Sequence, residues 1–159
     1  MEKNVWIIVL TTILLFYPFQ GVIKAEVNED IVSFGDSFKR LQEEDPKTPV
    51  AWEYLGVSYL LQEKDSDKAI ESFKKAVEID KNYFMGYVRL GQVYKNLGMK
   101  DEAKKNFKKA LPLIDGEIRR AEAKLNTFKG KEREVFKKVT LTVYEKTKKE
   151  CEKALGELE

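Results

Sequence analysis

The sequence reads AWEYLGVSYLLQEKDSDKAIESFKKAVEID from Ala51 to Asp80 and GYVRLGQVYKNLGMKDEAKKNFKKALPLID from Gly86 to Asp115. The aromatic, leucine and glycine positions that open the first stretch recur 35 residues later, and the alanine and phenylalanine positions near its end recur 34 residues later. A fixed period of this size is typical of stacked helical repeats. The difference of one residue predicts an extra residue in the first copy, in the turn near Glu63–Asp67.

Each copy has the pattern of two helices joined by a short turn. Trp52, Leu55 and Tyr59 are spaced by three and four residues, which places them on one face of a helix. Ala69, Phe73 and Ala76 have the same spacing on the helix that follows, and the polar residues between the two helices offer N-caps. Each copy is therefore predicted to form a helical hairpin.

Two glycines stand inside the apolar stripes of the first helices, Gly56 in the first copy and Gly91 in the second. Glycine within a helix costs about 0.5–1 kcal/mol relative to alanine. We therefore expect the two helices of each hairpin to approach closely at these residues. In the second copy, Gly98 is predicted to end the first helix, with Asp101 and Glu102 in the first turn of the next one.

These positions resemble the tetratricopeptide repeat (TPR) family, whose pattern is W-x2-L-G-x2-Y, then A-x3-F-x2-A, then P. The first copy lacks only the final proline, and the second has Tyr87 for the tryptophan and Asp115 for the proline. The resemblance implies an all-α fold, a TPR-type α-solenoid of antiparallel hairpins, whose first helices line a concave groove. It assigns one repeat to residues 48–81 and another to residues 82–115.

The first 25 residues are predicted to be a signal peptide. Val5–Phe19 is a mostly apolar run that would span about 22 Å as a helix, less than the hydrocarbon core of a bilayer. A helix breaker follows, and cleavage is expected after Ala25. An exported protein, periplasmic or secreted, is therefore predicted, and the alternative is a chain anchored in the membrane by residues 5–19.

The remaining segments are predicted to cover the ends of the repeat stack. Residues 26–47 contain an amphipathic stripe of Phe34, Phe38 and Leu41, which predicts an N-terminal capping helix; the alternative is a segment that occupies the groove itself. Residues 116–159 are predicted to form a degenerate third helical pair or C-terminal cap. Its first helix would be Gly116–Phe128, because Pro112 should end or kink the helix before it.

The last helix of that pair is predicted to be long, from Glu132 to Leu158. Its apolar stripe advances by about 3.7 residues, nearer the α-helical period than a coiled-coil repeat, which favours packing against the repeats over dimerisation. The stripe consists of Phe136, Val139, Val143, Thr147, Cys151, Ala154 and Leu158.

Composition argues against an enzyme. The chain has no histidine and a single cysteine, which excludes histidine-based catalysis, zinc sites built from histidine or cysteine, and an intrachain disulfide. Its acidic residues lie singly on predicted helix surfaces, without a glycine-rich phosphate loop. No catalytic residue, metal site or cofactor is predicted.

Charge is distributed unevenly along the chain. Acidic residues outnumber basic ones by seven to three in residues 26–47, whereas basic residues outnumber acidic ones by seventeen to twelve from Met99 to Glu159. The aromatic residues lie on the apolar stripes and not between the lysines, so solvated faces are favoured over a nucleic-acid-binding surface. Weak attraction to an acidic partner or an anionic membrane surface stays open.

The resemblance also indicates where a partner would bind, because the groove is lined by first-helix residues that the hairpin core does not use. These residues are Val50, Glu53, Val57, Leu60, Met85, Val88, Arg89, Gln92 and Lys95. TPR domains that grip a free carboxylate use lysine and asparagine in the first repeat; Glu53 and Val57 stand there instead. A protein or peptide segment, extended or helical, is the predicted ligand.

The predicted function is a non-enzymatic protein-interaction scaffold in an extracytoplasmic compartment. The alternative is a membrane-anchored subunit or assembly factor of an envelope complex. A groove covered by the terminal helices is a further alternative, and the sequence leaves the partner and the oligomeric state open.

Overall fold

The computed structural model describes residues 48–159, and all regular structure within them is helical. The predicted signal peptide and N-terminal capping helix lie outside the described residues. The elements in chain order are α4 (Pro49–Ser58), the π-helical turn η1 (Tyr59–Glu63), α5 (Ser66–Ile79), α6 (Phe84–Asn96), α7 (Lys100–Leu125), α8 (Gly130–Phe136), the π-helical turn η2 (Lys137–Leu141) and α9 (Thr142–Glu157). The predicted all-α fold is confirmed.

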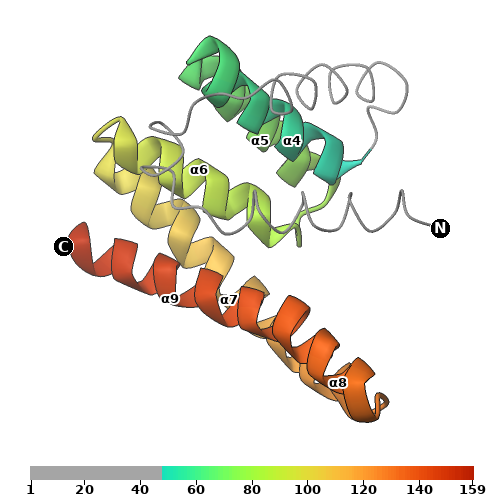
Figure 1. Cartoon of the computed structure of the whole chain (residues 1–159). Coiled ribbons are helices and arrows are strands. Elements are labelled where there is room, and N and C mark those ends of the chain that lie inside the picture. The colour runs from blue at the N-terminus through green and yellow to red at the C-terminus, as the bar shows by residue number, and fades with distance from the viewer. Residues whose placement is uncertain (1–47) are drawn as a thin grey trace.

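The two predicted repeats form two helical hairpins that stack side by side. Helix α4 packs against α5, α6 packs against α7, and α5 packs against α6 between the hairpins (Figure 1). The aromatic residues of the repeat pattern are central to this packing: Phe73 is 0% exposed and Phe107 is 2% exposed. This arrangement is the TPR-type solenoid that the resemblance implies.

The glycines inside the first helices lie where the helices of each hairpin touch. A Cβ atom at Gly56 would lie 2.5 Å from Cε1 of Phe73, and one at Gly91 would lie 2.7 Å from Cε1 of Phe107. Both distances are shorter than any van der Waals contact between carbon atoms. The predicted close approach at Gly56 and Gly91 is therefore confirmed.

The extra residue of the first repeat lies before the turn and not within it. Lys64 and Gly98 occupy equivalent positions, because both have left-handed backbones (φ 51° and 74°) directly after a first helix. From Lys64 onward, equivalent residues of the two repeats are therefore 34 positions apart. The extra residue of the first repeat lies in the π-helical turn η1. The sequence-based placement at Glu63–Asp67 was wrong by a few residues, since a π-helical turn adds one residue without ending the helix.

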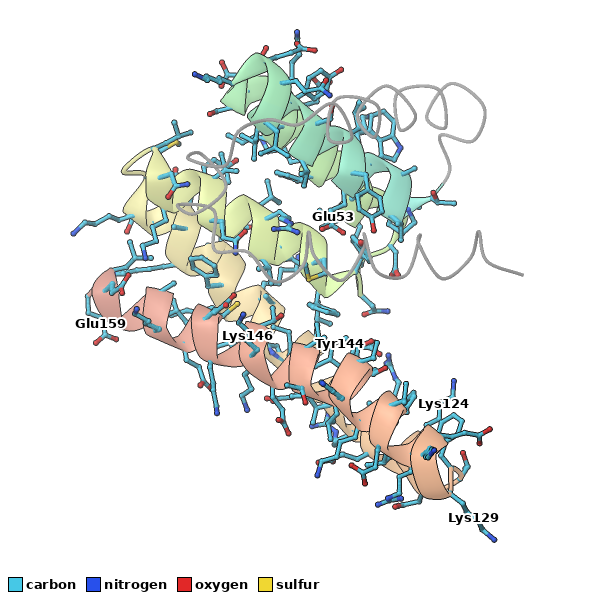
Figure 2. All side chains as sticks on the ribbon, viewed as in Figure 1. Glu53, Lys124, Lys129, Tyr144, Lys146 and Glu159 are labelled. Carbon is cyan, nitrogen blue, oxygen red and sulfur yellow. The ribbon has the colours of Figure 1, made fainter. Side chains whose placement is uncertain are left out.

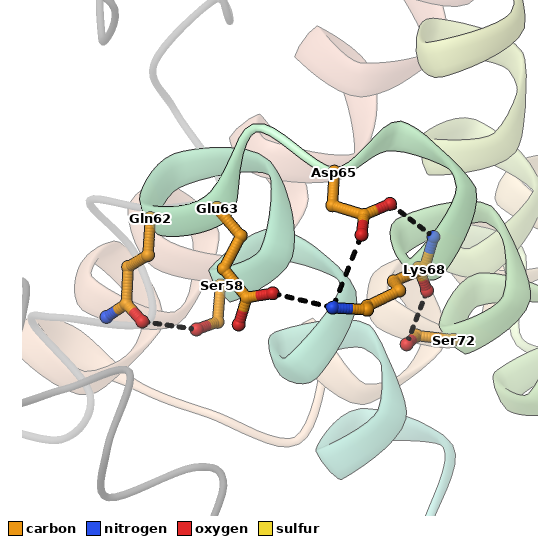
Figure 3. Close-up of polar contacts among 6 residues, drawn as sticks. All are labelled: Ser58, Gln62, Glu63, Asp65, Lys68 and Ser72. Atoms are coloured by element: carbon orange, nitrogen blue, oxygen red, sulfur yellow. Dashed lines mark hydrogen bonds and ion pairs between the residues drawn. The ribbon is translucent and has the colours of Figure 1, made fainter.

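The turn that follows η1 is fixed by local polar contacts, shown in Figure 3. The side chain of Asp65 accepts a hydrogen bond of 3.0 Å from the backbone N–H of Lys68, which caps α5. The amine of Lys68 in turn pairs with Glu63 at 2.9 Å and with Asp65 at 3.3 Å. In the second repeat the corresponding helix end is closed as predicted, with the N–H of Met99 donating to the carbonyl of Tyr94 at 2.9 Å.

Helix α7 continues through Pro112, where the sequence predicted that the helix would end or kink. It runs for 26 residues, so the predicted border between residues 115 and 116 falls within one helix. A proline inside a helix costs about 3 kcal/mol or more. The buried residues on either side, Ala110 and Ile114 (both 0% exposed), hold α7 against its neighbours through this region, and Pro112 itself faces solvent.

Helix α9 occupies the place that a third first helix would take. It packs against α7 and runs in the same direction as α6: Phe84 contacts Tyr144 at one end, with ring centroids 5.6 Å apart, and Lys95 pairs with Glu157 at the other. The sequence assigned that role to Gly116–Phe128. The structure instead places most of that segment in the extension of α7.

The predicted apolar stripe of the last helix is confirmed from Val143 onward and wrong at Val139. Val143, Thr147, Cys151, Ala154 and Leu158 are all buried. Val139 is 40% exposed, and Leu141 takes its place in the core. Both residues belong to η2, whose wider turn changes which side chains face the core.

Gly91→Ala should lower the melting temperature, because its methyl group would meet the buried ring of Phe107. Overpacking of this kind costs about 1–3 kcal/mol. Gly116→Ala is the matched control: it lies inside α7, and a Cβ there meets nothing within 4 Å. It should leave the melting temperature unchanged or raise it, since alanine favours a helix by about 0.5–1 kcal/mol. Equal melting temperatures for the two variants would contradict the close approach at Gly91.

Candidate partner-binding surface

The nine residues predicted to bind a partner all lie on the first helices of the two hairpins. Helix α4 with η1 carries Val50, Glu53, Val57 and Leu60, and α6 carries Met85, Val88, Arg89, Gln92 and Lys95. We call this set the first-helix surface. The structure brings its two halves together, because α4 and α6 are in contact.

An ion pair joins the two halves of the first-helix surface. Nε of Arg89 donates to a carboxylate oxygen of Glu53 at 3.0 Å, and the side chains are only 14% and 5% exposed. The hydroxyl of Tyr83 donates to the other oxygen of Glu53. Nη1 of Arg89 also lies 3.4 Å from the side-chain oxygen of Gln92. The buried carboxylate is therefore satisfied from α6 and from the residue that precedes it.

Tyr83 was not predicted as part of this surface. It is the residue directly before α6. The equivalent residue of the first repeat, Thr48 before α4, is not aromatic, so the repeat pattern did not mark this position. Burial raises the pKa of the Tyr83 hydroxyl far above its usual range, and the neighbouring Glu53 carboxylate raises it further. Tyr83 therefore remains a hydrogen-bond donor to Glu53.

The apolar residues of the first-helix surface differ in exposure. Val50 is 44% exposed, and Val57 and Leu60 are half-buried. Met85 and Val88 are 6% and 2% exposed and belong to the main core cluster. The accessible apolar part of the surface is therefore on α4 and η1, whereas α6 contributes mainly polar side chains.

The C-terminal helix reaches the first-helix surface at one corner. Lys95, near the end of α6, forms an ion pair with Glu157 at the end of α9. The hydrogen bond to this lysine and its charge lower the pKa of the Glu157 carboxyl. The charge of Lys95 is therefore paired within the chain, and the end of α9 lies at the edge of the first-helix surface.

The described part of the chain shows no arrangement of a metal or nucleophilic site. Within residues 48–159, no group of three or more potential metal-ligating side chains comes together. Cys151 is 1% exposed, and burial, with smaller contributions from Glu150 and Glu152, raises the pKa of its thiol to about 12. A thiol in this state is not an activated nucleophile at neutral pH. No helix among the described residues has the length and apolar character needed to cross a membrane.

Comparisons with known proteins give matches over the two repeats. A family model described as TPR repeat matches residues 60–98, and one described as tetratricopeptide repeat matches residues 86–113. Two solved structures, titled "Crystal structure of MamA" and "Crystal structure of MamA protein", are similar to the chain, each with 23% sequence identity and a TM-score of 0.46. The alignments cover 77% of this chain and 68% and 64% of those chains. No curated protein matches the sequence.

Arg89→Met should destabilise the chain strongly, because it leaves the carboxylate of Glu53 buried without its ion-pair partner. Breaking a buried pair costs about 3–5 kcal/mol. Adding Glu53→Gln should recover much of that loss, since it removes the isolated charge and keeps an acceptor for the hydroxyl of Tyr83. Urea denaturation measures both changes.

Arg120→Met is the matched control for this cycle. Arg120 pairs with Glu117 on the surface, where its side chain is 70% exposed, and exposed pairs contribute about 0–1 kcal/mol. If the two single arginine variants lost the same small free energy of unfolding, the Glu53–Arg89 pair would not join the two hairpins as described.

Proposed function

We propose, from the premise that this chain carries tetratricopeptide repeats, that it is a non-enzymatic scaffold that binds a segment of a partner protein on the first-helix surface. The main support is the side-by-side placement of α4 and α6, joined by the Glu53–Arg89 pair. A pair of helices held in this way offers a rigid surface to a peptide segment.

The chemistry of the surface favours a partner segment with an apolar side. The two charges at its centre neutralise each other, and the charge of Lys95 is neutralised by Glu157. The apolar side chains that keep exposed area, Val50, Val57 and Leu60, follow one another along α4 and η1. A free C-terminal carboxylate is disfavoured as the ligand, because both cations of the surface are already paired, Arg89 with Glu53 and Lys95 with Glu157.

The proposal places the chain outside the cytoplasm. Its support is the sequence alone: a mostly apolar run at Val5–Phe19, a helix breaker after it, and a small residue at Ala25. The second candidate uses the same surface in a chain that stays anchored by residues 5–19, as a subunit or assembly factor of an envelope complex.

Val50→Asp combined with Gln92→Glu should reduce capture of the partner without loss of helicity. Both positions keep exposed area, and the added carboxylates would have to be desolvated against an apolar segment. The control is Ile79→Asp with Asn82→Asp, on and after α5; Ile79 is 44% exposed, as Val50 is. Affinity capture with quantitative mass spectrometry compares both with the wild type. Equal recovery of the same proteins by all three chains would refute the proposed binding surface.

Mass spectrometry of the native N-terminus should find a chain that begins at Glu26, because the segment before it is predicted to be removed on export. The measurement is made on protein from the producing cells, separated into soluble envelope and membrane fractions. A chain that keeps residues 1–25 and sediments with membranes would favour the anchored alternative instead.

A further inference from the structure

The end of the α7–α8 hairpin projects beyond the repeats (Figure 1). We call residues 118–141 the distal hairpin. It has a small core of its own, in which Ala121, Leu125 and Leu141 are buried together, separate from the main core. The rings of Phe128 and Phe136 pack across its tip with centroids 4.9 Å apart. The two repeats do not need this extension to bury their own phenylalanines, so a different role for it has to be sought.

The distal hairpin concentrates positive charge. From Lys124 to Lys138 there are six lysine or arginine residues and two glutamates, a net charge of +4 from 6 − 2, whereas the whole chain has a net charge of +2. Lys124 and Lys129 lie toward the projecting end (Figure 2). The ion pairs formed among residues 48–159 leave out Lys129, Lys131, Lys137 and Lys138. These amines are therefore available to an external anion.

Two apolar side chains are exposed on the same hairpin. Val135 is 61% exposed and Val139 is 40% exposed, and their spacing of four residues directs them to one side of the helix. The π-helical turn η2 is the reason, because it brings Leu141 into the core in place of Val139. Lys131 precedes Val135 by four residues and Lys138 follows it by three, so both lie beside the exposed valines. π-Helical turns occur frequently at functional sites.

We propose that the distal hairpin docks on the surface of an anionic lipid bilayer. Its lysines would contact lipid phosphates while Val135 and Val139 enter the headgroup region. Basic clusters of four to eight residues on amphipathic helices are typical of proteins that bind anionic lipids. An acidic protein would also attract the charge, but charge alone would leave Val135 and Val139 exposed to water. The surface of an anionic bilayer offers both negative charge and an apolar layer beneath it. This site is distinct from the first-helix surface, so the two proposals can fail independently.

The test uses the full chain with Val135→Cys, labelled at the introduced thiol with an environment-sensitive dye. Cys151 is 1% exposed, so labelling of the folded chain is selective. Vesicles of phosphatidylcholine alone are compared with vesicles of equimolar phosphatidylcholine and phosphatidylglycerol. Residues 5–19 are present in every chain, so the difference between the two lipid compositions reports on the distal hairpin. We expect a blue shift of the dye with anionic vesicles only, weakened by salt.

Lys131→Glu with Lys138→Glu, added to the labelled chain, should weaken binding to anionic vesicles by about tenfold or more, given the contribution of each basic residue near such a surface. The control is Lys105→Glu with Lys108→Glu, which changes the net charge equally at two exposed positions on the repeat part of α7. It should bind nearly as the parent does. Circular dichroism checks that both variants keep their helicity, and Lys131→Gln with Lys138→Gln repeats the test without added negative charge.

Three results would overturn the proposal. One is a dye response that is equal for neutral and anionic vesicles. Another is an equal loss of binding in both charge-reversed variants, which would assign the attraction to net charge in general. The third is a dye response to polyglutamate without one to anionic vesicles, which would assign the distal hairpin to an acidic protein.

Discussion

The structure depends on contacts between bulky side chains and glycine backbones at three successive helix pairs. Phe73 lies against Gly56 within the first hairpin, and Phe107 lies against Gly91 within the second. Between the hairpins, Val77 lies against Gly86, where a Cβ atom would be 2.4 Å from Cγ1 of the valine. Each contact sets how closely two helices approach. The side-by-side placement of α4 and α6, and with it the first-helix surface, follows from the contacts of Phe73 and Val77, because both glycine-bearing helices pack against α5.

Periodicity predicted two of these contacts and missed the third. Gly56 and Gly91 interrupt apolar stripes at equivalent positions of two copies, so the sequence marks them. Gly86 corresponds to Ala51 in the first copy, and a single glycine at a helix start gives no such signal. The predicted end of the helix near Pro112 and Gly116 was wrong for a different reason. Local propensity favours a break there, but the packing of Ala110 and Ile114 keeps α7 continuous.

The candidate site could be predicted as a set of helix positions but not as a set of contacts. The spacing placed Glu53 and Arg89 among the first-helix positions that the hairpin core does not use, and the structure shows that both side chains are largely buried, 5% and 14% exposed. Their ion pair spans 36 residues of sequence, and such pairing depends on how neighbouring hairpins stack. The burial of Met85 and Val88 could not be predicted from the sequence either. A helix in the middle of a stack touches neighbours on several sides, and periodicity alone does not tell which side stays open.

The two π-helical turns bear on how such a chain changes in evolution. In η1 the first repeat carries one residue more than the second, yet Phe73 and Phe107 reach equivalent places. One additional residue is therefore accommodated inside a helix, without moving either flanking segment out of alignment with the other repeat. We expect differences in repeat length to collect at the ends of first helices, where one wider turn contains them. In η2 a wider turn likewise accompanies the outward placement of Val139, which leaves an apolar side chain on the surface.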